Sequence, residues 1–317
     1  MSDHIKLFSK YLFLPLTVVF VTVLFYYHHL ESEKILSTDI LSADKAEELF
    51  LSAPPQIGSL SGQGITILFN GYPLPYDAET DTYYLSQNMN TDDWQGALSL
   101  SVPDGELYFL EDEFLFHKSL AISTGHAFSL YAQAGGSSQL LSLVVTGLPL
   151  ISLTSAYSED PSYDPDLQPD EYYFDSQTRY YGAVVIFNAN PDSGKCQTVF
   201  SPVTFHERGA SSTKYGRKKN YSVKLLEEDG TRNEQYLFDI GTHAKWKLFN
   251  DGSKVRDMTS LTLWSEIASK ETDFMEHSAE MAYCEVVVDG RYNGLCGVLS
   301  PVDEDTLHLK DGDSLYK

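Results

Sequence analysis

Residues 205–225 read FHERGASSTKYGRKKNYSVKL: a β-prone segment, a loop containing Gly and Ser, and a second β-prone segment. Lys219 has the same parity as Tyr221 and Val223, so in a strand these three side chains face the same way. An ammonium group on an apolar face is costly unless an anion accompanies it. We therefore predict that Lys219 begins a strand and that its charge is paired with an acid or with a bound phosphate.

The charge of this stretch is opposite to that of the whole chain. Residues 201–225 contain six basic residues and one acid, whereas the 317-residue chain has 22 basic and 45 acidic residues and a net charge of −23. The acid excess argues against nucleic acid as a partner, because phosphate backbones bind clustered Lys and Arg. The basic stretch is either a solvated loop or a phosphate site, and the flexible Gly209 beside Arg208 favours the second. Ser211 and Ser212 would add hydroxyl donors.

The segments around this stretch predict a strand-rich half with one helix. Ser253 can cap a helix that runs to about residue 269 and places Trp264 and Ile267 on one apolar face. Asp289 and Gly290 form a two-residue turn between β-prone runs, which predicts a hairpin. Further strands are expected at residues 148–157, 180–189, 201–209 and 246–251.

Three cysteines cannot form a closed set of disulfides. In the predicted hairpin Val288 faces Arg291, and an unbroken register then places Cys284 opposite Leu295. Cys296 would therefore point to the other face of the sheet. We expect no bridge between Cys284 and Cys296, and the cysteines do not reveal the cellular compartment.

The N-terminal region contains an uncharged apolar run at residues 11–27, extendable to Leu30, at the lower length limit of a transmembrane helix. Aromatic residues lie at both ends, and Lys6 and Lys10 precede the run, which predicts a cytoplasmic N-terminus. A cleaved signal peptide would need an A-x-A-like site, which does not follow the run. A buried core helix is the less favoured alternative, because the run is apolar on every face. We predict a single-pass signal anchor from Tyr11 to Leu30, with the bulk of the chain outside the cell membrane.

The pattern of residues along the whole chain predicts four regions. Short β-prone runs separated by Gly, Pro, Asn and Asp indicate a small β-sandwich. The acidic stretch 158–175 lacks the spacing of a calcium loop and is predicted to be a solvated insertion. The expected regions are a cytoplasmic tip and transmembrane anchor (1–30), a stalk (31–63), a β-sandwich-like domain (64–147) and a C-terminal domain (148–317).

Several standard chemistries are not indicated by any motif. The sequence has no P-loop, no dinucleotide-binding G-x-G-x-x-G, no H-E-x-x-H, no nucleophile elbow and no H-R-D or D-F-G of ordinary kinases. The nine histidines are scattered, and we expect no metal site.

From Leu148 onward the order of elements resembles the spore coat protein H (CotH) kinase family. The resemblance implies the N-lobe of an atypical kinase, an antiparallel sheet plus one helix that closes over ATP phosphates. The predicted fold class is therefore α+β and strand-rich: a transmembrane helix, a small β-sandwich and a kinase-like N-lobe. The matching segments are LPLISLTSA, YYGAVVIF, FHERGASSTKYGRKKNYSVKL, WKLFND, VRDMTSLTLWSEIA, AYCEVVVDGRYNGLCGVL, VDEDTL and GDSLYK.

The resemblance also implies roles for individual residues. Arg208 and Lys219 would contact the phosphates of ATP, with Ser211 and Ser212 in support. Glu266 of the predicted helix would orient Lys219, as an acid of the N-lobe helix does in kinases. The family's magnesium-binding and catalytic acids would lie beyond Lys317, so the catalytic residues of this chain are unknown.

The chain departs from the family pattern in two places. Ser300 stands where the family usually has Glu, and Asp257 stands where it usually has Asn. Because the resemblance puts the family's catalytic and magnesium-binding acids beyond Lys317, we expect the 317 residues alone to be an inactive fragment that does not bind ATP and Mg productively.

Two functions of different classes remain open. The first is an extracytoplasmic atypical kinase acting on Ser residues of surface or spore-coat proteins. The second is a non-catalytic cell-surface scaffold or binding protein.

Overall fold

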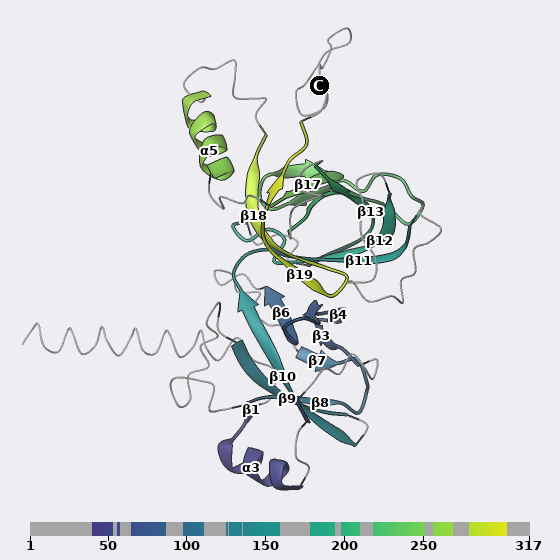
Figure 1. Ribbon diagram of the computed structural model, residues 1–317, viewed down its shortest axis with the longest axis vertical. Helices are drawn as coiled ribbons and strands as arrows, with labels where there is room; N and C mark the ends of the chain where they lie inside the picture. The colour runs from purple at the N-terminus through teal and green to yellow at the C-terminus, as the bar shows by residue number, and fades with distance from the viewer. Residues whose placement is uncertain are drawn as a thin grey trace, which may run out of the picture. The chain divides into compact units, whose positions relative to one another are not determined.

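The computed structural model describes residues 40–52, 56–57, 65–86, 98–110, 125, 127–134, 136–158, 178–193, 198–209, 218–250, 256–268 and 279–302. The chain divides into two compact units. The first comprises Met1–Pro73 and Asp92–Ser142, and the second comprises Leu74–Thr91 and Leu143–Lys317. Figure 1 shows both units as strand-rich.

The first unit contains a mixed sheet and a three-stranded sheet. In the mixed sheet the strand order is β1-β8-β9-β10; β1 runs parallel to β8, and β2 runs parallel to β10. Two short strands from the predicted stalk, β1 and β2, thus join this sheet. The elements are β1 (Ile40–Leu41), α3 (Ala43–Ser52), β2 (Gln56–Ile57), β3 (Ile67–Phe69), β4 (Tyr72–Pro73), β7 (Leu98–Leu100), β8 (Glu106–Leu110), β9 (Ala127–Ala134) and β10 (Ser137–Thr146), of which β4-β3-β7 form the three-stranded sheet.

The second unit is built on a closed barrel of seven strands in the order β11-β12-β13-β14-β17-β19-β18 (Figure 1). Neighbouring strands are antiparallel except β11 and β18, whose parallel pairing closes the barrel. The elements are β5 (Tyr76–Asp77), β6 (Thr82–Ser86), β11 (Leu150–Ser158), β12 (Tyr180–Phe187), β13 (Thr198–Arg208), β14 (Asn220–Leu225), β15 (Gln235–Leu237), β16 (Gly241–His243), β17 (Lys245–Phe249), α5 (Arg256–Ala268), β18 (Met281–Val288) and β19 (Arg291–Leu299).

The barrel interior is filled by the alternate side chains of every strand. In β14 the buried residues are Tyr221, Val223 and Leu225, and in β13 the inward positions continue from Phe205 to Glu207. All seven strands contribute to one hydrophobic cluster. A shared core of this kind stabilises the barrel through apolar burial, since each buried side chain contributes about 1.5–3 kcal/mol.

The predicted fold class is wrong in its architecture. The C-terminal strands close into a barrel, whereas the prediction was an antiparallel sheet plus one helix that resembles a kinase N-lobe. On α5, Trp264 and Ile267 are 52% and 53% exposed, so the predicted apolar face is not buried. Strand alternation reports one buried face per strand and does not report whether the sheet closes, because closure depends on the distant β11–β18 pairing.

The transmembrane helix of the predicted fold class also finds no counterpart among the described helices. Neither α3 nor α5 is long and apolar enough to cross a membrane. The segment from Tyr11 to Leu30 and the acidic stretch 158–175 lie outside the described residues, except for Ser158 at the end of β11. The predicted domain boundaries and location stay predictions.

The predicted hairpin is confirmed in its turn and corrected in its register. Asp289 and Gly290 have φ of 47° and 72°, as a two-residue hairpin turn requires, and Val288 faces Arg291. A bulge between Val286 and Val287 then shifts the register. Cys284 consequently lies opposite Cys296 instead of Leu295. Both thiols are free, as expected, but the argument that they lie on opposite faces is wrong.

Candidate functional site

Lys219 lies immediately before the first residue of β14 and continues the parity of its buried side chains. The strand begins at Asn220, and Tyr221 and Val223 face the core. The predicted parity of Lys219 is therefore confirmed. Its side chain is 23% exposed, so the ammonium lies near the end of the barrel interior with partial access to water.

The charge of Lys219 is paired with Glu207 of the neighbouring strand. Lys219 Nζ lies 3.5 Å from Glu207 Oε2, and the Glu207 side chain is only 2% exposed. Glu207 is the last inward residue of β13 and faces Tyr221. A buried carboxylate needs a cation nearby, and the Lys219 ammonium provides it. Glu207 shares the parity of Phe205, and this signal was available in the sequence.

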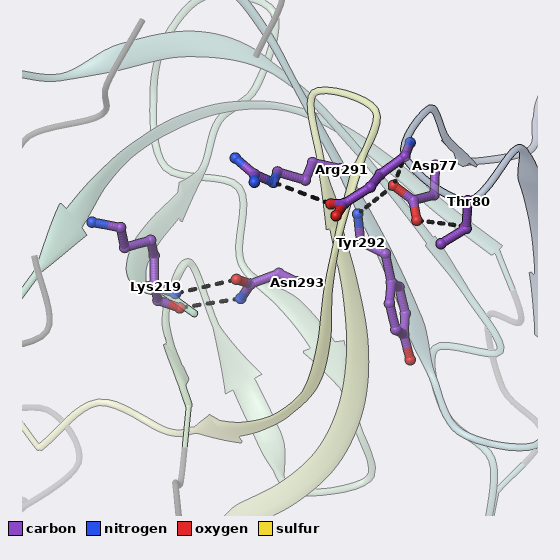
Figure 2. A network of polar contacts seen from close by, with 7 residues as sticks. Asp77, Thr80, Lys219, Arg291, Tyr292 and Asn293 are labelled. Carbon is purple, nitrogen blue, oxygen red and sulfur yellow. Dashed lines mark hydrogen bonds and ion pairs between the residues drawn. The ribbon is translucent and has the colours of Figure 1, made fainter. Parts of the chain in front are cut away.

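Asn293 of β19 fixes the backbone of Lys219 (Figure 2). Asn293 Oδ1 accepts a hydrogen bond from Lys219 N–H, and Asn293 Nδ2 donates to the Lys219 carbonyl, each at 3.1 Å. Nearby, Asn250 Nδ2 donates to the Lys218 carbonyl at 3.2 Å, and Asn250 N–H donates to Asn220 Oδ1 at 2.6 Å. Two asparagine side chains from β19 and the end of β17 thus hold the entry to β14.

The bulge in the β18–β19 hairpin puts Asn293 where it can reach Lys219. Asn293 is the extra residue of the bulge: Tyr292 pairs with Val287, and Gly294 pairs with Val286. Gly294 has φ of 81°, which favours glycine. The dipeptide Asn293-Gly294 is the sequence signal for this irregularity, and sequence reasoning missed it together with Glu207 and Asn250.

The other predicted site residues do not converge on Lys219 in the described part of the chain. Arg208 follows Glu207 and lies on the opposite face of β13, next to Asn220. Gly209 has φ of 91°, in agreement with its expected flexibility. Glu266 is exposed on α5, and Ser211 and Ser212 lie outside the described residues.

Arg208 lies on the outer face of β13, where its charge affects the pKa of His206. Partial burial lowers the pKa of His206, and the positive charges of Arg179 and Arg208 lower it further. Burial and the two Arg charges therefore all favour the neutral form of His206.

A hairpin inserted from the N-terminal half holds the residue before Asn293 (Figure 2). The buried carboxylate of Asp77 accepts hydrogen bonds from Tyr292 N–H at 3.3 Å and from the Thr80 hydroxyl at 2.6 Å. Ala78 N–H donates to the Gly290 carbonyl at 3.0 Å. The β5–β6 hairpin is thus hydrogen-bonded to the β18–β19 turn. The neighbouring Arg291–Glu79 ion pair, at 4.0 Å and largely exposed, contributes little to stability.

The outer face of the β18–β19 hairpin carries a half-buried acid, Glu285 of β18. Burial raises the pKa of Glu285, while hydrogen bonds to Tyr292 and Thr146 and the charge of Lys218 lower it by smaller amounts. Burial and the Glu285 charge also raise the pKa of Tyr292. The Tyr292 ring stacks on Tyr84, with centroids 4.6 Å apart and planes 4° apart.

The described residues include a side chain that suits a phosphate group, but they do not include a cluster of metal ligands. The Lys219 ammonium is suited to a phosphate oxygen. Across the described ranges, no three His, Cys, Asp or Glu side chains gather where they could hold a metal ion. Lys219 is thus a candidate phosphate contact, and the described residues do not gather a set of magnesium ligands.

The position of Ser300 has a structural explanation. Ser300 is buried, its hydroxyl oxygen accepts a hydrogen bond from Glu280 N–H at 2.9 Å, and its own N–H donates to the Glu280 carbonyl at 3.0 Å. The Ser300 hydroxyl and backbone thus join the ends of β18 and β19.

A closed barrel with a lysine at one end of its interior does not by itself indicate one protein family. Comparison with known families gives a more specific result. Residues 205–317 match the family model described as CotH kinase protein. The predicted CotH resemblance is thereby confirmed over these residues, which include Glu207, Lys219 and Asn293. No curated protein matches the chain.

Proposed function

We propose that the CotH-like part of this chain binds nucleotide phosphate through Lys219, as part of an atypical kinase that modifies Ser residues of surface or coat proteins. The observation that carries the proposal is the ion pair between Lys219 and the buried Glu207. A lysine held by a carboxylate presents its ammonium in a defined direction, as the lysine–glutamate pair of kinases does. The two hydrogen bonds from Asn293 add a fixed backbone.

Binding of ATP to the chain joined to a CotH-family C-lobe, measured by calorimetry with and without Mg, tests the proposal. Lys219→Ala should abolish the heat of binding. Lys224→Ala is the matched control, because Lys224 belongs to the same strand but has the outward parity of β14. Its loss should leave binding within about twofold, through weak screened electrostatics alone. The absence of binding to the wild-type chain that carries the C-lobe, or equal binding by its Lys219→Ala variant, would contradict the proposal.

Phosphoryl transfer requires groups beyond Lys219. The proposal assigns no catalytic base, because such transfer depends on positioned acids and metal charge, and the described residues supply no metal cluster. The expectation that the 317 residues alone are inactive stays a prediction. It is checked by incubation with labelled ATP and a Ser-containing acceptor protein.

A second function is favoured by the exposed face of α5. Three large apolar side chains of α5 are each more than half exposed: Leu263, Trp264 and Ile267. Ile267 is one helical turn beyond the other two, so the three lie close together on the helix surface. An exposed group of large apolar side chains is typical of protein contacts. A scaffold or binding role would be supported if ATP does not bind the wild-type chain that carries the C-lobe and Trp264→Ala abolishes capture of a surface protein.

A further inference from the structure

Cys284 and Cys296 are direct cross-strand neighbours inside the barrel. They are paired in the antiparallel register of β18 and β19. Their side chains are 0% and 1% exposed and belong to the same core cluster. The bulge at Val286 and Val287 is the cause of this arrangement, since an unbroken register would have put the two thiols on different faces.

The spacing of such a pair suits a covalent bond. Directly opposed residues of antiparallel strands have Cα atoms about 4.5 or 5.5 Å apart. Both values lie within the range of about 4.4–6.8 Å found for disulfides. Gly294 lies two residues before Cys296, and Gly297 lies one residue after it. The conformational freedom of these glycines allows the backbone to shift slightly so that the two sulfurs can come within bonding distance.

Other uses of two buried thiols are less well supported. Burial raises the pKa of Cys284 and raises that of Cys296 to about 11, so neither is an activated nucleophile. Within the described part of the chain, no third metal-ligating side chain joins them. A cross-link therefore fits the pair better than catalysis or metal binding.

We propose that Cys284 and Cys296 form an intramolecular disulfide across β18 and β19 when the chain folds in the presence of a small-molecule disulfide such as oxidised glutathione. One thiol loses its proton and attacks the oxidant, which releases one small thiol and leaves a mixed disulfide. The second deprotonated sulfur attacks that mixed disulfide, forms the Cys284–Cys296 bond and releases the second small thiol. The protein loses two hydrogens, and the oxidant takes up both electrons.

The bond is expected to form during folding, because native burial shields both sulfurs from the oxidant. Once formed, it would join the two strands that flank the bulge and hold Asn293 in place. The proposal rests on the strand register alone and is independent of nucleotide binding.

The test uses the full 317-residue chain with Cys196→Ser, which removes the third thiol. The reduced chain is refolded from urea in glutathione buffers of increasing oxidised fraction, and a folded sample is incubated in the same buffers. Free thiols are alkylated before digestion. Trypsin cleaves after Lys270, Arg291 and Lys310, so Cys284 and Cys296 fall in two separate peptides, 271–291 and 292–310.

The expected result is a species lighter by two hydrogens and a linked pair of these peptides that separates on reduction. The soluble oxidised chain should melt at a higher temperature than its reduced form, because the cross-link restricts the unfolded chain. Cys284→Ser in the same background should give only the mixed glutathione adduct or the free thiol of Cys296. Alkylation of both cysteines in the refolded and the folded samples at every buffer composition would overturn the proposal.

Discussion

Asn293 forms hydrogen bonds to both backbone polar groups of Lys219, one accepted from the N–H and one donated to the carbonyl, at 3.1 Å each (Figure 2). The two residues are 74 positions apart in the sequence. The β-bulge of the β18–β19 hairpin aims Asn293 at the candidate phosphate-binding lysine. Asp77 holds the adjacent Tyr292 N–H, so a hairpin from the N-terminal half supports the same site.

Asn293→Ala should destabilise the fold by about 1–3 kcal/mol, because it leaves backbone groups of Lys219 without their partner at a part-buried position. Asn293→Asp is the matched variant. It can still accept from the Lys219 N–H but cannot donate to the carbonyl, and an intermediate loss is expected. Urea unfolding followed by circular dichroism measures both, and equal stability of all three proteins would contradict the assigned role.

Glu207→Gln should lower the free energy of unfolding by about 1–3 kcal/mol, because it removes the buried anion beside Lys219. The loss stays moderate because the ammonium keeps some access to water. The double variant with Lys219→Met should be less destabilised than the sum of the single variants, with a coupling of about 0.5–3 kcal/mol. Strict additivity in the unfolding free energies would show that the two side chains do not interact.

Gly294→Ala should destabilise the chain by about 1–2 kcal/mol because φ is 81° there. Gly136→Ala is the control, with φ of 80° and open space around the added carbon. At Gly294 the added carbon would also crowd the end of Lys218, so Gly294→Ala should cost more. Adding Lys218→Ala should recover that difference and leave the backbone cost, as measured by thermal and urea unfolding.

The stability of the second unit should depend on the protonation of Glu285. Its folded pKa lies above the ordinary value of 4.5, so the folded chain binds the proton more tightly than the unfolded chain does. The ionised form is the less stable one. Wild-type stability should therefore fall, relative to Glu285→Gln, as the pH rises from about the ordinary pKa through the raised value.

Unfolding free energies of the two proteins at several pH values check this dependence. Glu228→Gln, at an exposed turn position, controls for the loss of one carboxylate. A constant difference between wild type and Glu285→Gln across this pH range would contradict the raised pKa.

The sequence alone was sufficient for the local features. The alternation around Lys219 predicted its parity, and Asp289-Gly290 predicted the turn and the pairing of Val288 with Arg291. The CotH resemblance was likewise carried by sequence, because the matching segment 205–317 contains its signature. These properties depend on the two-residue period of a strand and on the φ preferences of turn residues, which neighbouring residues determine.

The tertiary structure decided which distant residues meet. Pairing of β11 with β18 closes the barrel, and their paired residues Leu150 and Glu285 are separated by more than a hundred positions. Packing inside that barrel selects Glu207 as the partner of Lys219, and one bulge brings Asn293 to Lys219 and Cys284 to Cys296. A one-residue shift of register exchanges the faces of every side chain beyond it. Such a shift is stabilised by contacts across the whole barrel, and the alternation within a single strand does not reveal it.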